Sequence, residues 1–328
     1  MRNLNRSRRA ALTLLALVLA APLGAAAQAW PSKPIRFVVP FAPGGTSEII
    51  ARSVAQELST QLGQAVYVEN KAGGAGTIAM GDVKNAPADG YTILLGHVGS
   101  LAVNPYAMKN HPFDVNKDFT PVALLARVPN LFVINADTVK AKDFKEFIAA
   151  AKAQPGKLNY GSAGNGSAGH LAMEYLKAVT GVDIQHVPYK GTGPMLQDLL
   201  GGRIEATNAG APALLPHVKS GKLKAIAVGS TQRIPALPDV PTVAELGYKE
   251  FETSQWYGVI VRAGTPPEIV TRLNAEINKA LRSSQVTQRY ATDNAIADAG
   301  TPEQFAAFIA KEQGRWREVV RKANITIE

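Results

Sequence analysis

Two glycine-rich loops, each placed before a predicted helix, are the segments of this sequence best suited to bind a small anion. The first runs from Phe41 to Ser47. Adjacent glycines allow a tight turn that exposes backbone N–H groups, and the following helix N-terminus carries partial positive charge. An ordinary capped turn is the alternative interpretation. The ligand-binding candidates in this first loop are Phe41, Pro43, Gly44, Gly45, Thr46 and Ser47.

The second loop, Gly161–Gly169, offers the same backbone chemistry with more side-chain donors. Its serine hydroxyls can donate to a carboxylate, and its glycines admit close approach of a ligand. A predicted helix, His170–Thr180, follows directly. The candidates in this second loop are Ser162, Ala163, Gly164, Asn165, Gly166, Ser167 and His170.

The second loop also contains two patterns typical of enzymes, and both are incomplete. Its glycines fit the spacing G-x-G-x-x-G of dinucleotide sites, but the following strand ends in Pro188–Lys190 instead of the acidic residue that binds a ribose. The segment around Ser167 is similar to the hydrolase motif G-x-S-x-G, except that Asn165 stands at its first position. A serine hydrolase therefore remains the alternative to a binding protein, and turnover of the ligand separates the two.

Three further loops can face the same cleft, because ligands of open α/β sheets bind beyond the carboxyl ends of the strands. They are Gly96–Ser100, Tyr189–Gly193 and Asn208–Gly210, and they contribute the candidates His97, Gly99, Ser100, Tyr189, Lys190, Asn208 and Ala209. The histidines lack metal-binding spacing such as H-E-x-x-H, and the sequence contains no cysteine. We expect no catalytic residue, no metal and no cofactor.

The elements that position these loops alternate between strand and helix, which predicts an α/β fold with largely parallel sheets. The apolar stretch Val122–Ile134 is long for one strand, so we expect it to run from one lobe into the next. Asp239–Thr242 is predicted to open a short helix. Helices after Pro266 are expected to return and cover the first sheet, so that the backbone crosses between the lobes twice.

The N-terminus has the three-part pattern of a secretory signal peptide. Arginines at positions 2, 6, 8 and 9 precede the apolar stretch Ala10–Leu23 and the small residues Ala25–Ala27. Removal of residues 1–27 lowers the formal net charge from +9 to +5, because the segment carries four arginines. This mild excess suits small anions and lacks the concentrated basic stripe of a nucleic-acid-binding protein. We expect a soluble, exported periplasmic protein without nucleic-acid partners.

A series of short motifs connects the chain to a known family. They are Trp30–Ile35, Val39–Gly45, Val68–Asn70, Asp89–Thr92, Leu158–Ser162, His170–Ala172, His186–Gly191, Leu237–Thr242 and Trp256–Gly258. With these motifs the chain resembles the Bug-type receptors, the extracytoplasmic solute-binding proteins of tripartite tricarboxylate transporters. Glu48 departs from the family, which more often has Asp at this position.

The resemblance implies a type II periplasmic-binding-protein fold, with two lobes joined by two crossover strands and a ligand in the cleft. Lobe 1 would comprise residues 28–127 and 254–328, and lobe 2 residues 128–253. In the family the two glycine loops, here Pro43–Ser47 and Ser162–Ser167, hold the ligand carboxylate, partly through water. The implied function is capture of a small carboxylate, or a related anionic or amide metabolite. A monomeric receptor would deliver it transiently to integral membrane transporter subunits.

Overall fold

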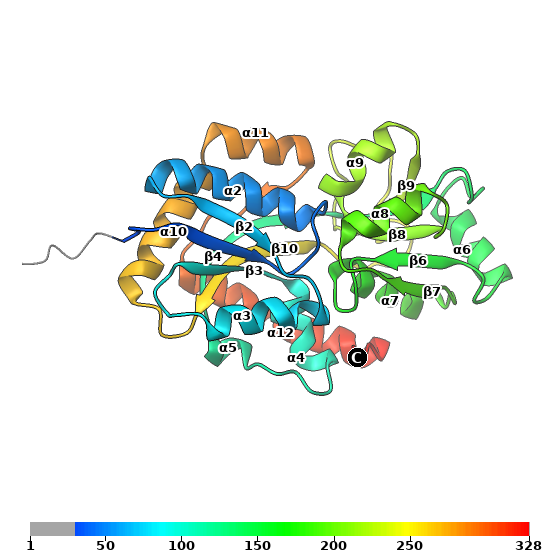
Figure 1. The fold of residues 1–328 in the computed structure, drawn as a ribbon. Helices are drawn as coiled ribbons and strands as arrows, with labels where there is room; N and C mark the ends of the chain where they lie inside the picture. The colour runs from blue at the N-terminus through cyan, green and yellow to red at the C-terminus, as the bar shows by residue number, and fades with distance from the viewer. Residues whose placement is uncertain (1–29, 328) are drawn as a thin grey trace, which may run out of the picture. The chain divides into compact units, whose positions relative to one another are not determined.

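The computed structural model describes residues 30–327, and their strands form two sheets (Figure 1). The first sheet has the order β11-β4-β10-β3-β1-β2. In it β1, β2 and β3 are parallel, whereas β10 is antiparallel to both β3 and β4. Its strands are β1 (Ile35–Val39), β2 (Val66–Asn70), β3 (Thr92–His97), β4 (Phe119–Val128), β10 (Gln255–Arg262) and β11 (Ile296–Ala297).

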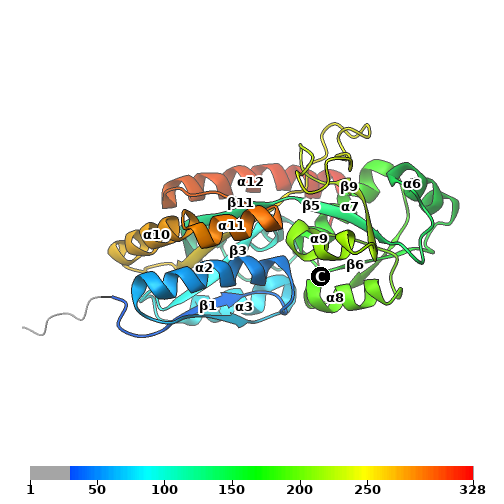
Figure 2. The same cartoon turned by 90° about the horizontal axis from the view of Figure 1, so that it is seen from above.

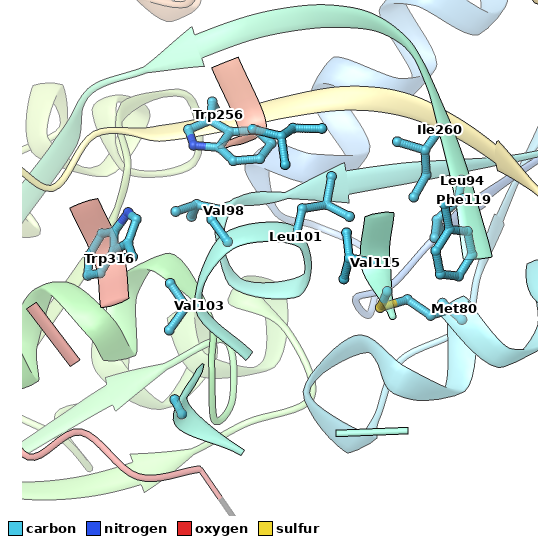
Figure 3. Close-up of a cluster of buried hydrophobic side chains, with 14 of the residues drawn as sticks. Met80, Leu94, Val98, Leu101, Val103, Val115, Phe119, Trp256, Ile260 and Trp316 are labelled. Carbon is cyan, nitrogen blue, oxygen red and sulfur yellow. The ribbon is translucent and has the colours of Figure 1, made fainter. Parts of the chain in front are cut away.

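Helices cover both faces of the first sheet, which explains why β10 is apolar and buried along almost its whole length. One face carries α2 (Thr46–Leu62) and α10 (Pro267–Leu281), with α11 (Ser284–Asp293) against α2. The core of the other face is drawn in Figure 3, where Leu94, Trp256 and Ile260 of the sheet meet Met80 and Trp316 from helices. The elements on this side are η1 (Gly74–Gly76), α3 (Thr77–Asn85), η2 (Gly99–Val103), α4 (Asn104–Ala107), α5 (Val115–Asp118) and α12 (Pro302–Ala323).

The second sheet has the order β7-β6-β8-β5-β9 and is also covered on both faces. Successive side chains of β5 point to opposite faces of this sheet, where two separate cores lie. Phe132 and Ile134 pack with α6 and α7, whereas Leu131 and Val133 pack with α8 and α9. The strands are β5 (Asn130–Asn135), β6 (Asn159–Ser162), β7 (Gln185–Pro188), β8 (Ala206–Gly210) and β9 (Leu223–Val228). The helices are α6 (Phe144–Ala153), α7 (Ala168–Thr180), α8 (Thr192–Leu200) and α9 (Ala211–Lys219).

The chain passes between the sheets twice, and both passages are visible in Figure 2. The first is Pro129, between β4 and β5, and lies inside the predicted stretch Val122–Ile134. The second is the segment 229–254 between β9 and β10. The prediction that Asp239–Thr242 opens a short helix is wrong, because only turns follow it. Thr242 and Glu245 form reciprocal capping hydrogen bonds, but Gly247 at φ +110° ends the segment after turns.

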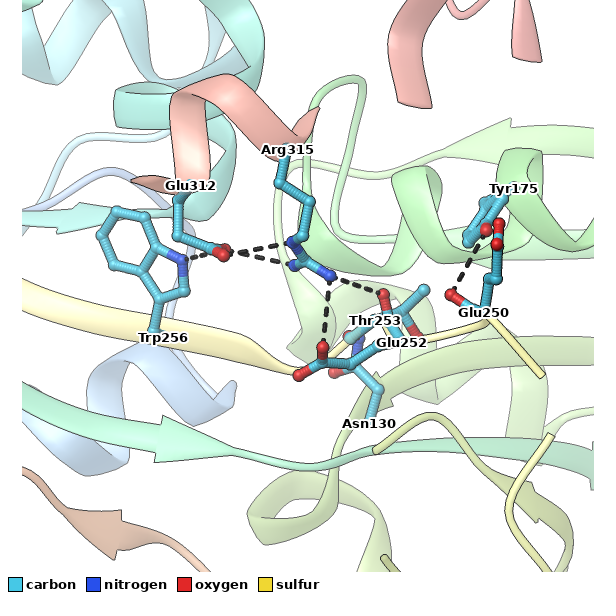
Figure 4. A network of polar contacts seen from close by, with 8 residues as sticks. All are labelled: Asn130, Tyr175, Glu250, Glu252, Thr253, Trp256, Glu312 and Arg315. Atoms are coloured by element: carbon cyan, nitrogen blue, oxygen red, sulfur yellow. Dashed lines mark hydrogen bonds and ion pairs between the residues drawn. The ribbon is translucent and has the colours of Figure 1, made fainter. Parts of the chain in front are cut away.

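A polar network ties the two passages together (Figure 4). Asn130 is fully buried, its Nδ2 donates to the carbonyl of Thr253 at 2.5 Å, and its Oδ1 accepts from Gln255 Nε2. Arg315 on α12 donates to the carbonyl of Glu252 at 3.2 Å. Helix α12 therefore holds the second passage in place, while Asn130 links it to the first.

None of the helices among residues 30–327 is long and apolar enough to cross a membrane.

Candidate functional site

A small cavity lies between the loops of the first sheet and those of the second, with a volume of about 20 Å³. Residues from both sides of the boundary form its wall. The first sheet and its loops contribute Phe41, Ser47, His97, Val98, Gln255 and Tyr257; the second contributes Ala163, Ser167, Ala168, Gly169, Thr192, Asn208, Ala209 and Gly210. Carboxyl ends of strands from two sheets thus meet at one place, as expected of an α/β ligand site.

Four helix N-termini converge on this cavity: those of α2, α7, α8 and α9. At α7 the side chain of Ser167 caps the helix by accepting from the backbone N–H of His170 at 3.3 Å. The helices α2, α8 and α9 have glycine at the N-cap and no side-chain cap. Backbone N–H groups and the partial positive charge of helix ends favour an anion here. None of the described residues in the wall is a lysine or arginine.

His97, at the end of β3, is a neutral hydrogen-bond donor in this wall. The residue is 2% exposed, and its Nδ1 accepts from the backbone N–H of Gly99 at 3.0 Å. In the neutral ring the proton therefore lies on Nε2. Burial lowers the pKa of His97 from 6.5 to about 3, so the ring stays uncharged at neutral pH. Nε2 has no hydrogen-bond partner among the described residues.

Asn208 and Gln255 place two buried amides in the same wall. The Gln255 amide is engaged, because it donates to Asn130 and accepts from the hydroxyl of Tyr257. It thereby connects the cavity to the passage at Asn130. Asn208 is 1% exposed, and neither the oxygen nor the nitrogen of its side chain has a partner within the described part of the chain.

A second hollow of about 270 Å³ opens beside the cavity and shares Phe41 and Ala163 with it. It brings the loop Gly73–Gly76 next to Gly164, Asn165, Tyr189 and Lys190. The hydroxyl of Tyr189 points elsewhere, since it donates to Asp198 Oδ2 at 2.7 Å. Burial and this carboxylate raise the pKa of Tyr189 to about 12.

The site residues predicted from the sequence fall into three groups in the structure. Phe41, Ser47, His97, Ala163, Ser167, Asn208 and Ala209 line the cavity; Gly164, Asn165, Tyr189 and Lys190 line only the second hollow. The remaining candidates, Pro43, Gly44, Gly45, Thr46, Gly99, Ser100, Ser162, Gly166 and His170, lie outside both walls. Ser162 is buried with its Oγ 2.7 Å from His186 Nε2, and the rings of His170 and His186 stack at 4.4 Å.

The sequence patterns do not single out seven residues of the wall, namely Val98, Ala168, Gly169, Thr192, Gly210, Gln255 and Tyr257. Thr192 and Gly210 lie in two of the loops expected beyond strand ends, so taking every polar or glycine residue of those loops includes them. Gln255 and Tyr257 lie on β10, which reaches the cavity only because the chain crosses back to the first sheet.

Direct contacts close the boundary beside the cavity. The backbone N–H of Ala42 donates to the carbonyl of Lys190 at 2.9 Å. Thr46 Oγ1 donates to the carbonyl of Gly210 at 3.5 Å. A Cβ built on Gly193 would lie 2.3 Å from the carbonyl oxygen of Pro43. Glycine at this position is therefore needed for the close approach of the two loops.

The buried histidines predict a loss of stability in acid. Burial lowers the pKa of His97 to about 3, of His170 to about 4 and of His186 to about 3. Below pH 6.5 the unfolded chain binds protons that the folded protein excludes, so the free energy of unfolding falls as the pH drops from about 6.5 toward 3. We expect a slope of about 1 kcal/mol per pH unit for each histidine. Urea unfolding at pH 7, 6 and 5 measures the slope of the unfolding free energy against pH. His97→Gln should make this slope shallower. A slope unchanged by the variant contradicts the conclusion that His97 is buried in its neutral form.

The chain matches the model of the tripartite tricarboxylate transporter family receptor over residues 50–325. It belongs to this receptor family. The receptor is 40% identical over 311 residues to Protein BugT of Bordetella pertussis strain Tohama I, with 94% of each chain covered. It is also similar to an R. palustris protein solved with adipate, at 38% identity and a TM-score of 0.87, covering 90% of this chain and 99% of that one. MatC from Rhodopseudomonas palustris with bound malate is 34% identical, with a TM-score of 0.85 and coverage of 89% and 100%.

These relationships confirm the type II periplasmic-binding-protein fold, with two lobes joined by two crossover strands, and the Bug-type resemblance. The family consists of solute-binding receptors, which confirms a role in transport rather than catalysis. The serine-hydrolase alternative has no support from the matched relatives.

Proposed function

We propose that the receptor captures a small carboxylate in the cavity between its lobes and delivers it to integral membrane transporter subunits. The observation that carries the proposal is the convergence of four helix N-termini on a wall without lysine or arginine. Two similar proteins were solved with dicarboxylates, adipate in one and malate in the other. The site residues are those of the cavity wall, supported by the two glycine loops.

Neutral donors suffice to hold a carboxylate when several act together. A carboxylate accepts several hydrogen bonds, and backbone N–H groups that point at it stabilise its charged form. The helix ends supply such groups, and His97 and Asn208 add side-chain donors. A buried carboxylate requires this full set, because burial without pairing is costly.

We propose that the lobes separate for the ligand to enter. Direct hydrogen bonds close the boundary beside the cavity, among them the bond from the backbone N–H of Ala42 to the carbonyl of Lys190 at 2.9 Å. We propose that residues 28–127 with 254–328 form one lobe, residues 128–253 the other, and that they open and close about Pro129 and the segment 229–254. Ligand shifts this equilibrium because it contacts both lobes only in the closed form. The loaded, closed form is the one that the membrane subunits would recognise.

The compartment follows from the same proposal. A receptor of this family acts in the periplasm, and residues 1–27, which carry the signal-peptide pattern, lie outside the described residues. We propose that this segment directs export and that the mature protein is a soluble monomer without cofactor.

A ligand screen tests the proposed function. The mature chain from residue 28 is mixed with di- and tricarboxylates, amino acids, aromatic acids and amides, and its thermal unfolding is recorded. A ligand at about 100 times its Kd should add about 2.7 kcal/mol to the free energy of unfolding. Calorimetry should give one site per chain, and the ligand recovered afterwards should be unchanged. Stabilisation by no compound of the panel, or chemical conversion of the bound one, contradicts the proposal.

A further inference from the structure

Asn208 is the most unusual polar group of the cavity wall. It lies in β8, in the interior of the second sheet, and is 1% exposed. Both ends of its amide lack a partner among residues 30–327. A buried polar group without a hydrogen bond costs free energy, so nearly all such groups in folded proteins are paired. Asn208 lines the cavity, so a molecule bound there is placed to be the partner of its amide.

The amide needs two kinds of partner, because one end donates and the other accepts. This holds for either orientation of the side chain, since exchange of oxygen and nitrogen leaves one donor and one acceptor. His97 Nε2 adds a donor to the same wall, also without a partner in the described chain. Among the fully buried side-chain atoms of this wall, those without a partner are thus His97 Nε2, a donor, and the two ends of the Asn208 amide, one a donor and one an acceptor.

A carboxylate ion matches only part of this set. Its oxygens accept hydrogen bonds from the donors, but it carries no proton for Asn208 Oδ1. A plain alkane dicarboxylate would therefore leave this oxygen buried and unpaired. A hydroxyl, amine or amide N–H next to the carboxylate supplies the missing donor.

We infer that the receptor selects carboxylates that bear a hydrogen-bond donor beside the carboxyl group, and that Asn208 is the residue that detects this donor. The inference rests on the proposed function and adds the class of ligand. Rejection of the analogue without the donor arises because the acceptor is left unpaired in a dry site, a mechanism that discriminates more strongly than size. His97 Nε2 donates to the carboxylate of the same ligand.

The test compares matched ligands on the unaltered mature protein by calorimetry. The pairs are malate with 2-methylsuccinate, 2-hydroxyglutarate with 2-methylglutarate, and 2-hydroxyadipate with 2-methyladipate, so that each hydroxyl is compared with a methyl group of similar size. For the chain length that fits, the hydroxy acid should bind at least tenfold more tightly than the methyl analogue. Equal affinity within every pair that binds overturns the inference and leaves the proposed function standing. If none of the six compounds binds, the inference is overturned, and the ligand screen described above decides the proposed function on its own.

A variant then locates the effect. Asn208→Leu, close in size, should bring the affinity ratio of the best pair down to about 1, chiefly by weakening the hydroxy acid. Asn85→Leu makes the same change at an exposed position at the end of α3, outside both walls, and should retain the full ratio. A ratio unchanged in Asn208→Leu contradicts the role of Asn208. If that variant does not fold, the ligand pairs on the unaltered protein still decide the inference.

Discussion

Replacement of Gly193 by alanine is expected to weaken ligand binding at least a hundredfold while leaving the protein folded. Gly193 is the second residue of α8, on the second lobe, and its φ is not in the left-handed region. Alanine therefore fits the helix itself. Its Cβ, however, would lie 2.3 Å from the carbonyl oxygen of Pro43 and 3.4 Å from Gly44 Cα, both on the first lobe. In the proposed open form these two loops separate, so we expect the clash to penalise the closed form alone.

Two measurements test the expected effect of Gly193→Ala on binding and on closure of the lobes. Calorimetry with the best ligand of the screen should show the loss of affinity, and small-angle scattering should show that saturating ligand reduces the radius of gyration of the unaltered protein but not of Gly193→Ala. Gly314→Ala is the matched control, because it also lies in a helix and a Cβ there meets nothing within 4 Å. Normal binding by Gly193→Ala would mean that the closed arrangement is not the ligand-bound form.

Replacement of Asn130 by alanine is expected to lower both stability and affinity. The change removes the hydrogen bonds to the Thr253 carbonyl and to Gln255, and it leaves both of these buried groups unpaired. Two unpaired buried groups correspond to about 2–4 kcal/mol of unfolding free energy. Gln255 lines the cavity and loses the contact that fixes its amide, so we expect at least tenfold weaker binding as well.

Asn135→Ala separates these two consequences. Asn135 lies at the other end of β5, is 2% exposed, donates to the Leu199 carbonyl at 2.7 Å and accepts from the backbone N–H of Asp137 at 2.8 Å. It should lose a similar amount of stability in urea unfolding, yet bind ligand as the unaltered protein does. Equal affinities of the two variants would show that the link between the passages does not act on the cavity.

Local sequence patterns mark the loops that reach the cavity, because glycine turns, strand ends and helix N-termini depend on neighbouring residues. Ser47 and Ser167 belong to the two glycine loops and Asn208 to a loop beyond a strand end, and all three residues line the cavity. The same patterns also selected Ser162 and His170. The structure places these two residues outside both walls, next to His186 on β7. A pattern identifies a loop that can reach a site, but packing decides which of its side chains face inward.

The sequence by itself determined the family, the α/β class and the loops that meet at the cavity, since these follow from motifs and local periodicity. Only the tertiary structure decided how the wall is completed. Gln255 and Tyr257 lie more than 200 residues from Phe41 along the chain, yet they line the same cavity because β10 returns to the first sheet. Likewise, the need of Asn208 for both a donor and an acceptor follows from the absence of a partner within residues 30–327. Hydrogen-bond satisfaction is a property of all neighbours in space, and no local segment specifies it.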